Sequence, residues 1–225
     1  MIDRAGARSA SASPRAAAAE LWLSAWQHLI GRVGHDIRNP LNGASLNLEV
    51  VRARAAVPGT DPLALAPFAE AASSQLSAAV ELVEALLTLA RPGRAPIDLE
   101  SVVRPLVRLY AALVGRGSGT GEDDGATHSG RITLVGESVA PSRVRVDADD
   151  ARLLVSEALD AATTGEGPHI VTCAIGRDEG HVVVDVRFER PTTAALSPSL
   201  DGVARASGIR RERTPEGIKL LFPVA

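Results

Sequence analysis

Apolar residues return with helical spacing across the first third of the chain. From about Ala17 they recur every three or four positions, which is the period of a helix with one buried face. The positions are Trp22, Trp26, Leu29, Val33, Ile37, Leu41, Ala44, Leu48 and Val51. Proline and glycine then cluster in residues 57–62 and predict a turn.

A second helical run follows the turn. Its first residue is expected between Pro62 and Pro67, because proline is tolerated in the first turn of a helix. Its seam consists of Phe68, Ala72, Gln75, Ala79, Leu82, Leu86 and Leu89. The spacings alternate between four and three, as in the heptads of a coiled coil. Pro92 and Gly93 end the run.

Two long helices joined by a short loop predict an antiparallel hairpin. A hairpin alone buries one stripe of each helix, whereas two copies can bury all the stripes as a four-helix bundle. The heptad-like seam favours this homodimer. The alternative is a hairpin that packs only on the rest of its own chain.

The pattern changes after Pro96. A helix is expected at residues 99–114 with Asp98 as its N-cap, followed by a glycine-rich flexible loop at 115–130. Strand-like runs then occur at Arg131–Val135, Val144–Val146, Ile170–Ile175, His181–Phe188 and Ile218–Phe222. One more helix, Asp149–Thr163, lies between the second and third of these runs. This half is therefore predicted to be an α/β unit with a largely antiparallel sheet.

The expected fold class is α plus α/β. Residues 1–16 contain Ser, Ala, Arg and Gly without any period and are expected to be a disordered lead-in. Residues 17–94 form the hairpin of a dimeric four-helix bundle, and residues 95–225 form an α/β sandwich. The boundary between the two domains is placed near residues 92–96.

Composition excludes several classes of function. The chain has 225 residues, 45% of them hydrophobic, and a net charge of -3, which gives no general attraction to nucleic acid or to an anionic membrane. It contains no apolar run of membrane-spanning length and no secretory signal. Cys173 is the one cysteine, so neither a disulfide framework nor a cysteine metal site is expected. A cytoplasmic protein is the default.

The candidate chemistry lies in the first helix, at His35-Asp36-Ile37-Arg38-Asn39-Pro40-Leu41. Side chains four positions apart share a helix face, so His35 and Asn39 are expected side by side. His35 is two positions, or about 200°, from the seam residues before and after it, and therefore faces outward. It belongs to a polar stripe formed by His28, Gly31, Arg32, His35, Arg38, Asn39, Asn42 and Ser45.

Pro40 lies inside this helix, where it removes the hydrogen bond to the carbonyl of Asp36. A proline in a helix interior costs about 3 kcal/mol, so a reason for it is expected. The apolar spacing also changes here, because Val33, Ile37 and Leu41 follow one another in steps of four. A bend or a change of winding is therefore predicted beside the histidine. Local irregularity of this kind is typical of functional sites.

This segment resembles the H-box of two-component sensor histidine kinases, which runs His, acid, two variable residues, small polar, Pro, Leu. The hairpin resembles that family's dimerisation and histidine-phosphotransfer domain. The resemblance implies that His35 accepts a phosphoryl group and that Asp36 is the general base. It implies that Asn39 helps to position a water molecule during dephosphorylation of the partner. The partner in that family is the receiver domain of a response regulator.

Residues 98–225 resemble the ATP-binding domain of the same kinases in the order of their elements. The chemical residues differ. The two asparagines of the N-box are replaced by Glu157 and Ala161, and an alanine cannot ligate Mg²⁺, which requires oxygen ligands. Residues 188–192 lack the glycines of the adenine-reading segment, and of the last glycine box only Gly202 is left. The domain is therefore expected not to bind ATP.

The leading hypothesis is a histidine phosphotransferase that relays a phosphoryl group between receiver aspartates through His35. It needs no intrinsic cofactor, because the receiver supplies its own Mg²⁺ and acidic pocket. The docking surface is expected to include His28, Arg32, Arg38 and Asn42, with the arginines facing the acidic cleft of the receiver. Nucleic acid and membranes are not expected as partners.

Three alternatives remain open from the sequence. One is an ATP-dependent histidine kinase with a divergent nucleotide site, which the two-domain layout favours. Another is a non-enzymatic pseudokinase that binds a regulator and has no need of His35. The last is a regulator phosphatase that uses Asp36 and Asn39.

Overall fold

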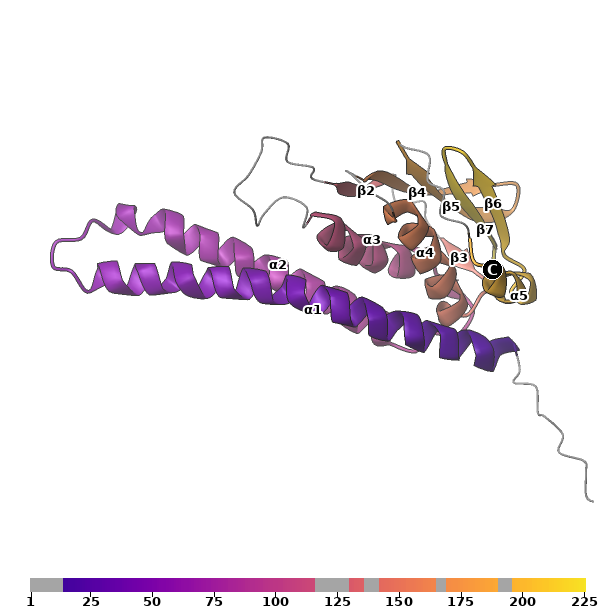
Figure 1. Ribbon diagram of the computed structural model, residues 1–225, viewed down its shortest axis with the longest axis horizontal. Coiled ribbons are helices and arrows are strands. Elements are labelled where there is room, and N and C mark those ends of the chain that lie inside the picture. The colour runs from indigo at the N-terminus through magenta and orange to yellow at the C-terminus, as the bar shows by residue number, and fades with distance from the viewer. Residues whose placement is uncertain (1–13, 116–129, 136–141, 165–168, 190–195) are drawn as a thin grey trace, which may run out of the picture.

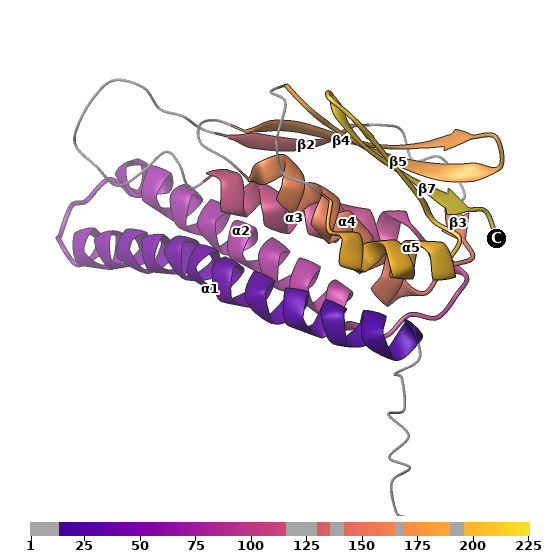
Figure 2. The same ribbon diagram turned by 45° about the vertical axis from the view of Figure 1, so that its right-hand side comes forward.

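The computed structural model describes residues 14–115, 130–135, 142–164, 169–189 and 196–225. The elements lie in three layers (Figures 1 and 2). A long helical hairpin forms one outer layer, a twisted sheet forms the other, and shorter helices are packed between them. The far half of the hairpin extends beyond the sheet and its helices. The fold is therefore α plus α/β, as predicted.

The hairpin consists of α1 (Pro14–Ala55) and α2 (Ala66–Ala90), with a short 3-10 turn, η1 (Pro62–Ala64), before α2. Asp61 caps that turn, because its carboxylate accepts a hydrogen bond of 2.9 Å from the backbone N–H of Leu63. The first helix begins three residues before the expected start at Ala17. None of the described helices is long and apolar enough to cross a membrane.

The inner face of α2 is the predicted seam. Four residues of the predicted seam, Ala72, Ala79, Leu82 and Leu89, are buried, and so is Ala85, which the seam did not include. A polar layer interrupts the seam at Gln75, whose amide oxygen accepts a hydrogen bond of 3.1 Å from Asn47 Nδ2. Gly43 makes room for it, since a Cβ there would lie 2.4 Å from Gln75 Nε2. Polar pairs within an apolar seam can fix the register of packed helices.

The predicted seam of α1 is only partly correct. Leu29, Val33 and Ala44 are buried, but Leu41 and Leu48 are exposed. The steps of four from Val33 to Leu41 each add about 40° of rotation, which carries Leu41 out of the hairpin interface. Pro40 lies inside α1, which runs through it as one helix from Pro14 to Ala55. The apolar residues of α1 therefore form two stripes, one buried and one exposed.

The α/β domain follows the linker in the order β1 (Ile97–Asp98), α3 (Glu100–Val114), β2 (Arg131–Val135), β3 (Arg143–Val144), α4 (Ala148–Thr163), β4 (Ile170–Asp178), β5 (His181–Phe188), η3 (Pro198–Leu200), α5 (Asp201–Ala206), β6 (Arg210–Thr214) and β7 (Gly217–Pro223). The main sheet has the order β2-β4-β5-β7-β6. Only β2 and β4 run parallel in it. The short strands β1 and β3 pair with each other.

Four of the described elements of this domain, β1, η3, α5 and β6, were not predicted from the sequence. Strand β6 consists only of polar residues, three of them arginines, so it lacks the apolar alternation that marks a strand. It lies at one edge of the sheet, where charged side chains prevent pairing with other molecules. Helix α5 has only six residues, which is too short for a periodic pattern.

The core lies between the sheet and helices α3 and α4. In β5, Val182, Val184 and Val186 are buried and alternate with more exposed residues, as expected for a sheet with one covered face. The phenol of Tyr110 in α3 meets the hydroxyl of Ser156 in α4 at 2.8 Å, which pairs the polar end of a fully buried ring. The other face of the sheet carries a row of charges formed by Asp185, Lys219 and Glu212 on neighbouring strands.

The hairpin and the α/β domain are joined by Arg152 of α4. Its Nη2 donates a hydrogen bond of 2.6 Å to the carbonyl of Arg91 at the end of α2, and its Nη1 donates to Asp149 at 3.0 Å. Its guanidinium also lies 5.9 Å from the ring centroid of Trp22 in α1. One buried cation therefore contacts both helices of the hairpin as well as its own helix.

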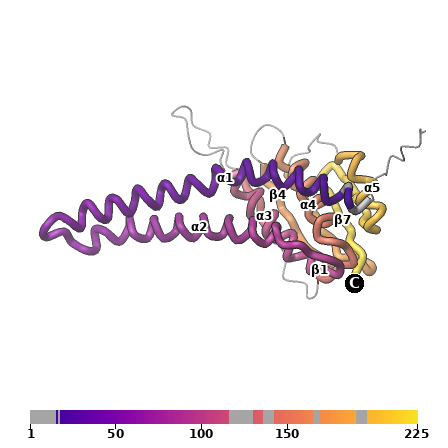
Figure 3. The backbone as a smooth tube through the Cα atoms, turned by 90° about the horizontal axis from the view of Figure 1, so that it is seen from below, coloured from indigo at the N-terminus to yellow at the C-terminus, as the bar shows by residue number. Residues whose placement is uncertain are grey.

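The linker between the two domains is also held by α4. The carbonyl of Gly93 accepts a hydrogen bond of 3.1 Å from the N–H of Ala148, and Asp147 accepts one of 3.1 Å from the N–H of Ala95. The N-terminal half of α1 runs beside α4 and α5 (Figure 3). Since the linker and both ends of the hairpin contact α4, the two domains have one defined arrangement.

Arg152 is expected to contribute strongly to stability. Arg152→Ala leaves the Arg91 carbonyl and the Asp149 carboxylate without this partner, and we expect a loss of about 2–4 kcal/mol in the free energy of unfolding. Urea denaturation followed by circular dichroism measures it. The matched control is Arg187→Ala, because the side chain of Arg187 is 68% exposed and that of Arg152 only 7%. The control should lose less than about 1 kcal/mol, and equal losses would contradict the role given to Arg152.

Candidate functional site

His35 is exposed on α1, on the side of the helix that faces away from α2. Its ring nitrogen Nδ1 lies 3.4 Å from the side-chain nitrogen of Asn39, one helical turn further on. That contact leaves Nε2 as the ring nitrogen that projects toward solvent. The arrangement can present one imidazole nitrogen to an incoming group, with the ring oriented through the other.

Asp36 follows His35 in the chain but lies on another side of the helix. It is buried, whereas His35 is exposed. Successive helical residues are rotated by about 100°, which turns this carboxylate toward the hairpin interior. The role of general base for Asp36 stays a prediction.

The predicted docking stripe is exposed apart from one contact. His28, Arg38 and Asn42 are exposed, and Arg32 forms an ion pair of 3.3 Å with Asp160 of α4. Gly31 lies on the same stripe, and a Cβ there would have no neighbour within 4 Å. The packing within this chain therefore does not require glycine at that position.

The helix that stands in the place of the family's N-box helix, α4, carries an internal ion pair at Glu157. Glu157 lies 2.9 Å from Arg211 of β6, and Arg211 also donates a hydrogen bond of 2.9 Å to Asp201. The side chains of Arg211 and Glu157 are only 6% and 13% exposed. The backbone N–H of Ser197 donates a further hydrogen bond to Glu157. Protein groups thus already occupy the surroundings of this carboxylate.

Burial raises the pKa of Glu157, and the hydrogen bond from Ser197 and the charge of Arg211 oppose that rise. Four residues further on, Ala161 is buried in the apolar core and offers no oxygen. The partner Arg211 could not be found from the sequence, because the strand that carries it was not predicted. The sequence offered only the presence of arginines in the last third of the chain, and nothing in it singled out Arg211 as the partner of Glu157.

Other sequence predictions for this region fall partly outside the described residues. Residues 190–192 of the expected nucleotide-reading segment and residues 116–129 of the glycine-rich loop are among those not described. Gly202 lies at the start of α5, and a Cβ there would meet nothing within 4 Å. Within the described residues, no three His, Cys, Asp or Glu side chains gather as a metal site.

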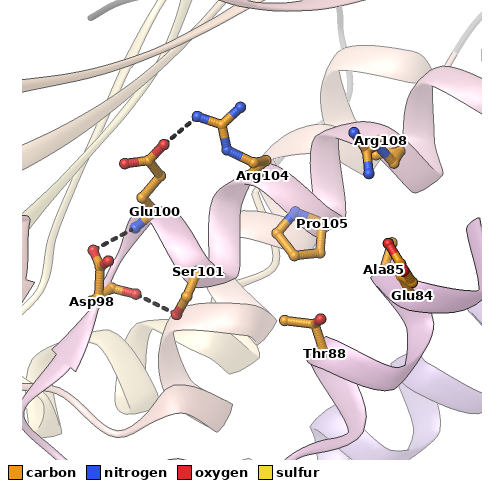
Figure 4. A pocket seen from close by; sticks show the side chains of 9 residues that line it. All are labelled: Glu84, Ala85, Thr88, Asp98, Glu100, Ser101, Arg104, Pro105 and Arg108. Atoms are coloured by element: carbon orange, nitrogen blue, oxygen red, sulfur yellow. Dashed lines mark hydrogen bonds and ion pairs between the residues drawn. The ribbon is translucent and has the colours of Figure 1, made fainter. Parts of the chain in front are cut away.

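A separate cavity of about 360 Å³ lies between α2 and α3 (Figure 4). It is lined by Glu84, Ala85, Thr88, Asp98, Glu100, Ser101, Arg104, Pro105 and Arg108. Much of this polar lining is paired internally. Arg104 bonds to Glu100, and the backbone N–H of Glu100 donates a hydrogen bond of 3.2 Å to Asp98. None of the lining residues comes from α1, so the cavity is distinct from the stripe around His35.

Residues 25–95 match the family model of the His Kinase A (phospho-acceptor) domain. No curated protein sequence matches the chain. Among solved structures it is similar to the histidine kinase AdeS of Acinetobacter baumannii, with 13% identity, a TM-score of 0.42, and coverage of 84% of this chain and 98% of that one. A bacterial phosphotransferase gives 15% identity, a TM-score of 0.40, and coverage of 88% and 95%.

The blue-light activated histidine kinase EL346 of Erythrobacter litoralis gives 17% identity, a TM-score of 0.35, and coverage of 87% of this chain and 60% of that one. At TM-scores below 0.5, these structural likenesses add nothing to the argument. The family match covers the whole of α2, the C-terminal part of α1, and the stripe that carries His35. The chain is therefore histidine kinase-like over residues 25–95, the segment that matches the phospho-acceptor domain model.

Proposed function

We propose that this protein is a histidine phosphotransferase that accepts a phosphoryl group from the aspartate of a response-regulator receiver domain and passes it to another receiver. The observation that carries the proposal is the exposed imidazole of His35 within the matched phospho-acceptor domain, with Nδ1 beside Asn39 and Nε2 directed outward. The chemistry requires one nucleophilic nitrogen and a surface on which a second protein can dock.

The transfer is an in-line displacement at phosphorus. With the Asn39 amide turned so that its oxygen accepts from Nδ1–H, Nε2 keeps the lone pair that attacks. The N–P bond forms as the P–O bond to the donor aspartate breaks, and the bonding pair of that bond returns to the aspartate as a carboxylate. The ring keeps its Nδ1 proton, so the net charge is unchanged. The reverse reaction delivers the group to the next receiver.

The receiver domain supplies the metal ion and the acidic groups that the stripe around His35 does not have. A receiver domain carries its own acidic pocket and Mg²⁺, so no metal ligand is needed from this chain. Arg38 is exposed three residues from His35 and provides a positive charge for an acidic partner. His28 and Asn42 extend the same surface along α1 in both directions.

Transfer between receivers is favoured over ATP-dependent autophosphorylation by two features of the α/β domain. The Glu157–Arg211 ion pair lies where the nucleotide ligands are expected, and Ala161 offers no oxygen for Mg²⁺. The domain is also tied to the hairpin through Arg152 and the linker. A kinase must bring its nucleotide to the histidine, and these contacts oppose such a movement.

The proposal includes a homodimer, which the exposed apolar residues of the hairpin support. Leu76, Val80, Val83 and Leu87 of α2 are exposed, and their spacing of four, three and four forms a second heptad seam. The exposed Leu41 and Leu48 of α1 add a parallel stripe. A second copy that covers both stripes completes a four-helix bundle.

The central test is phosphoryl transfer to His35. The wild-type protein incubated with a ³²P-labelled phosphorylated receiver should gain acid-labile, base-stable label. His35→Ala should gain none, because the other imidazole of the stripe, His28, has Arg32 and not an amide one helical turn further on to orient its ring. His181→Gln is the matched control and should be labelled as the wild type is, since His181 lies on β5. Equal labelling of His35→Ala would refute the proposal, and receiver binding without any transfer would favour a pseudokinase.

Nucleotide binding separates this proposal from an ATP-dependent kinase. We expect no heat of binding when ATP with Mg²⁺ at millimolar concentration is titrated into the protein in a calorimeter, because the Glu157 carboxylate is already paired with Arg211 and Ala161 offers no oxygen. We expect no labelling from γ-³²P-ATP alone. Saturable ATP binding together with labelling of His35 would establish the kinase instead.

The dimer has its own test. Val83→Glu places a charge in the second seam and should convert the dimer to a monomer in sedimentation velocity, since an unpaired buried charge costs several kcal/mol. Val83 is exposed in the single chain, so the hairpin itself should still fold. Ser74→Glu, an exposed position on the opposite side of α2, should leave the dimer intact. A monomeric wild-type protein would contradict the dimer.

A further inference from the structure

One charged contact joins the stripe around His35 to the α/β domain. Arg32 Nη1 lies 3.3 Å from Asp160 Oδ1, and their side chains are 40% and 50% exposed. Arg32 precedes His35 by three positions, so the two side chains are neighbours on the helix surface. The contact is therefore beside the phosphoryl acceptor, and the acid in it comes from a domain that the transfer chemistry does not otherwise use.

Asp160 is held in place by its own helix. It follows one helical turn after Ser156, which is buried and contacts the Tyr110 hydroxyl at 2.8 Å. Burial raises the pKa of Tyr110, and the negative charge of Asp160 raises it further, so the carboxylate lies near this phenol. An acid on α4 thus faces an arginine on the helix that carries His35.

We propose that Asp160 is a positioning residue that sets how strongly α1 retains a phosphoryl group on His35, because Asp160 and the phosphoryl group compete for Arg32. The inference rests on the proposed function. A phosphoryl group adds two negative charges near Arg32, and an arginine can form a bidentate contact with phosphate oxygens. Forming that contact requires Arg32 to leave Asp160.

The two electrostatic effects of Asp160 have the same sign. Its carboxylate repels the phosphoryl group directly, and it also withholds the charge of Arg32. Both destabilise the phosphohistidine relative to the phosphorylated receiver. Removing the charge of Asp160 therefore shifts the equilibrium toward His35, and we expect roughly a threefold to tenfold change for partly screened charges.

Only the receiver aspartate, the phosphoryl group and His35 change covalently in the transfer equilibrium. A receiver acyl phosphate and a neutral imidazole give a receiver carboxylate and a phosphoimidazole that keeps its Nδ1 proton. Asp160 gains or loses no proton or phosphoryl group in this step. It changes only the relative free energy of the two sides, which makes the equilibrium constant the quantity to measure.

The experiment measures the ratio of phospho-His35 to phosphorylated receiver after equilibration, with ³²P-labelled receiver and the full-length protein. Asp160→Asn should raise the equilibrium constant toward His35 by the stated threefold to tenfold. Asp160→Glu keeps the charge and should stay within about twofold of the wild type. Asp185→Asn is the control, because Asp185 lies on β5 and pairs with its own arginine, Arg187, at 2.8 Å. It should leave the equilibrium unchanged.

A second background tests whether Arg32 carries the effect. In Arg32→Gln the equilibrium should move away from His35, and adding Asp160→Asn should then produce a clearly smaller shift than in the wild type. Thermal unfolding of each variant accompanies the measurement. A structural role alone would lower the melting temperature without this non-additive pattern.

The possible results separate the proposed role of Asp160 from the proposed phosphotransferase function. If the wild-type protein accepts no label at His35, the proposed function fails and the inference fails with it. If the wild type is labelled but Asp160→Asn has the wild-type equilibrium, the inference alone is overturned. An equal effect of Asp160→Asn in both backgrounds also overturns it, because the competition for Arg32 would then be absent.

Discussion

The arrangement of this molecule depends on the buried guanidinium of Arg152. It bonds to the last turn of α2, to its own helix and, through its positive face, to the ring of Trp22. Burying a charge is costly unless it is paired, and the two Nη atoms of Arg152 find their partners only when the hairpin and the α/β domain lie in this orientation. That orientation brings Asp160 to Arg32. The same contact that stabilises the fold therefore determines which charges surround His35.

The hairpin could be predicted because its signals are local. Helical period, the turn at residues 57–62 and the His35-to-Leu41 motif are all read within short windows of sequence. The exposure of Leu41 could not be predicted with the same ease, because it depends on small rotations that accumulate along α1. The apolar residues of α1 belong to two stripes, one buried and one exposed. Their spacing alone does not show which residue belongs to which stripe.

The α/β domain was harder to predict because its polar network is long-range. Strand β6 has no apolar alternation, so the sequence did not place Arg211 in a strand. Its ion pair with Glu157 could therefore not be predicted. The pairing of Arg32 with Asp160 spans 128 positions in the chain and leaves no local signal. The stripe around His35 was visible in sequence as a set of polar residues. Only the structure shows that one of them is tied to another domain.

The two stripes of α1 point in different directions, and this separates two kinds of association. Leu41 and Leu48 lie about 120–140° around the helix from His35. A second copy packed on the leucines therefore leaves both imidazoles on the outer sides of the pair. In such a dimer each chain can bind a partner protein at His35 without blocking the site on the other chain. The dimer then has two independent binding sites, with a limiting stoichiometry of one partner per chain.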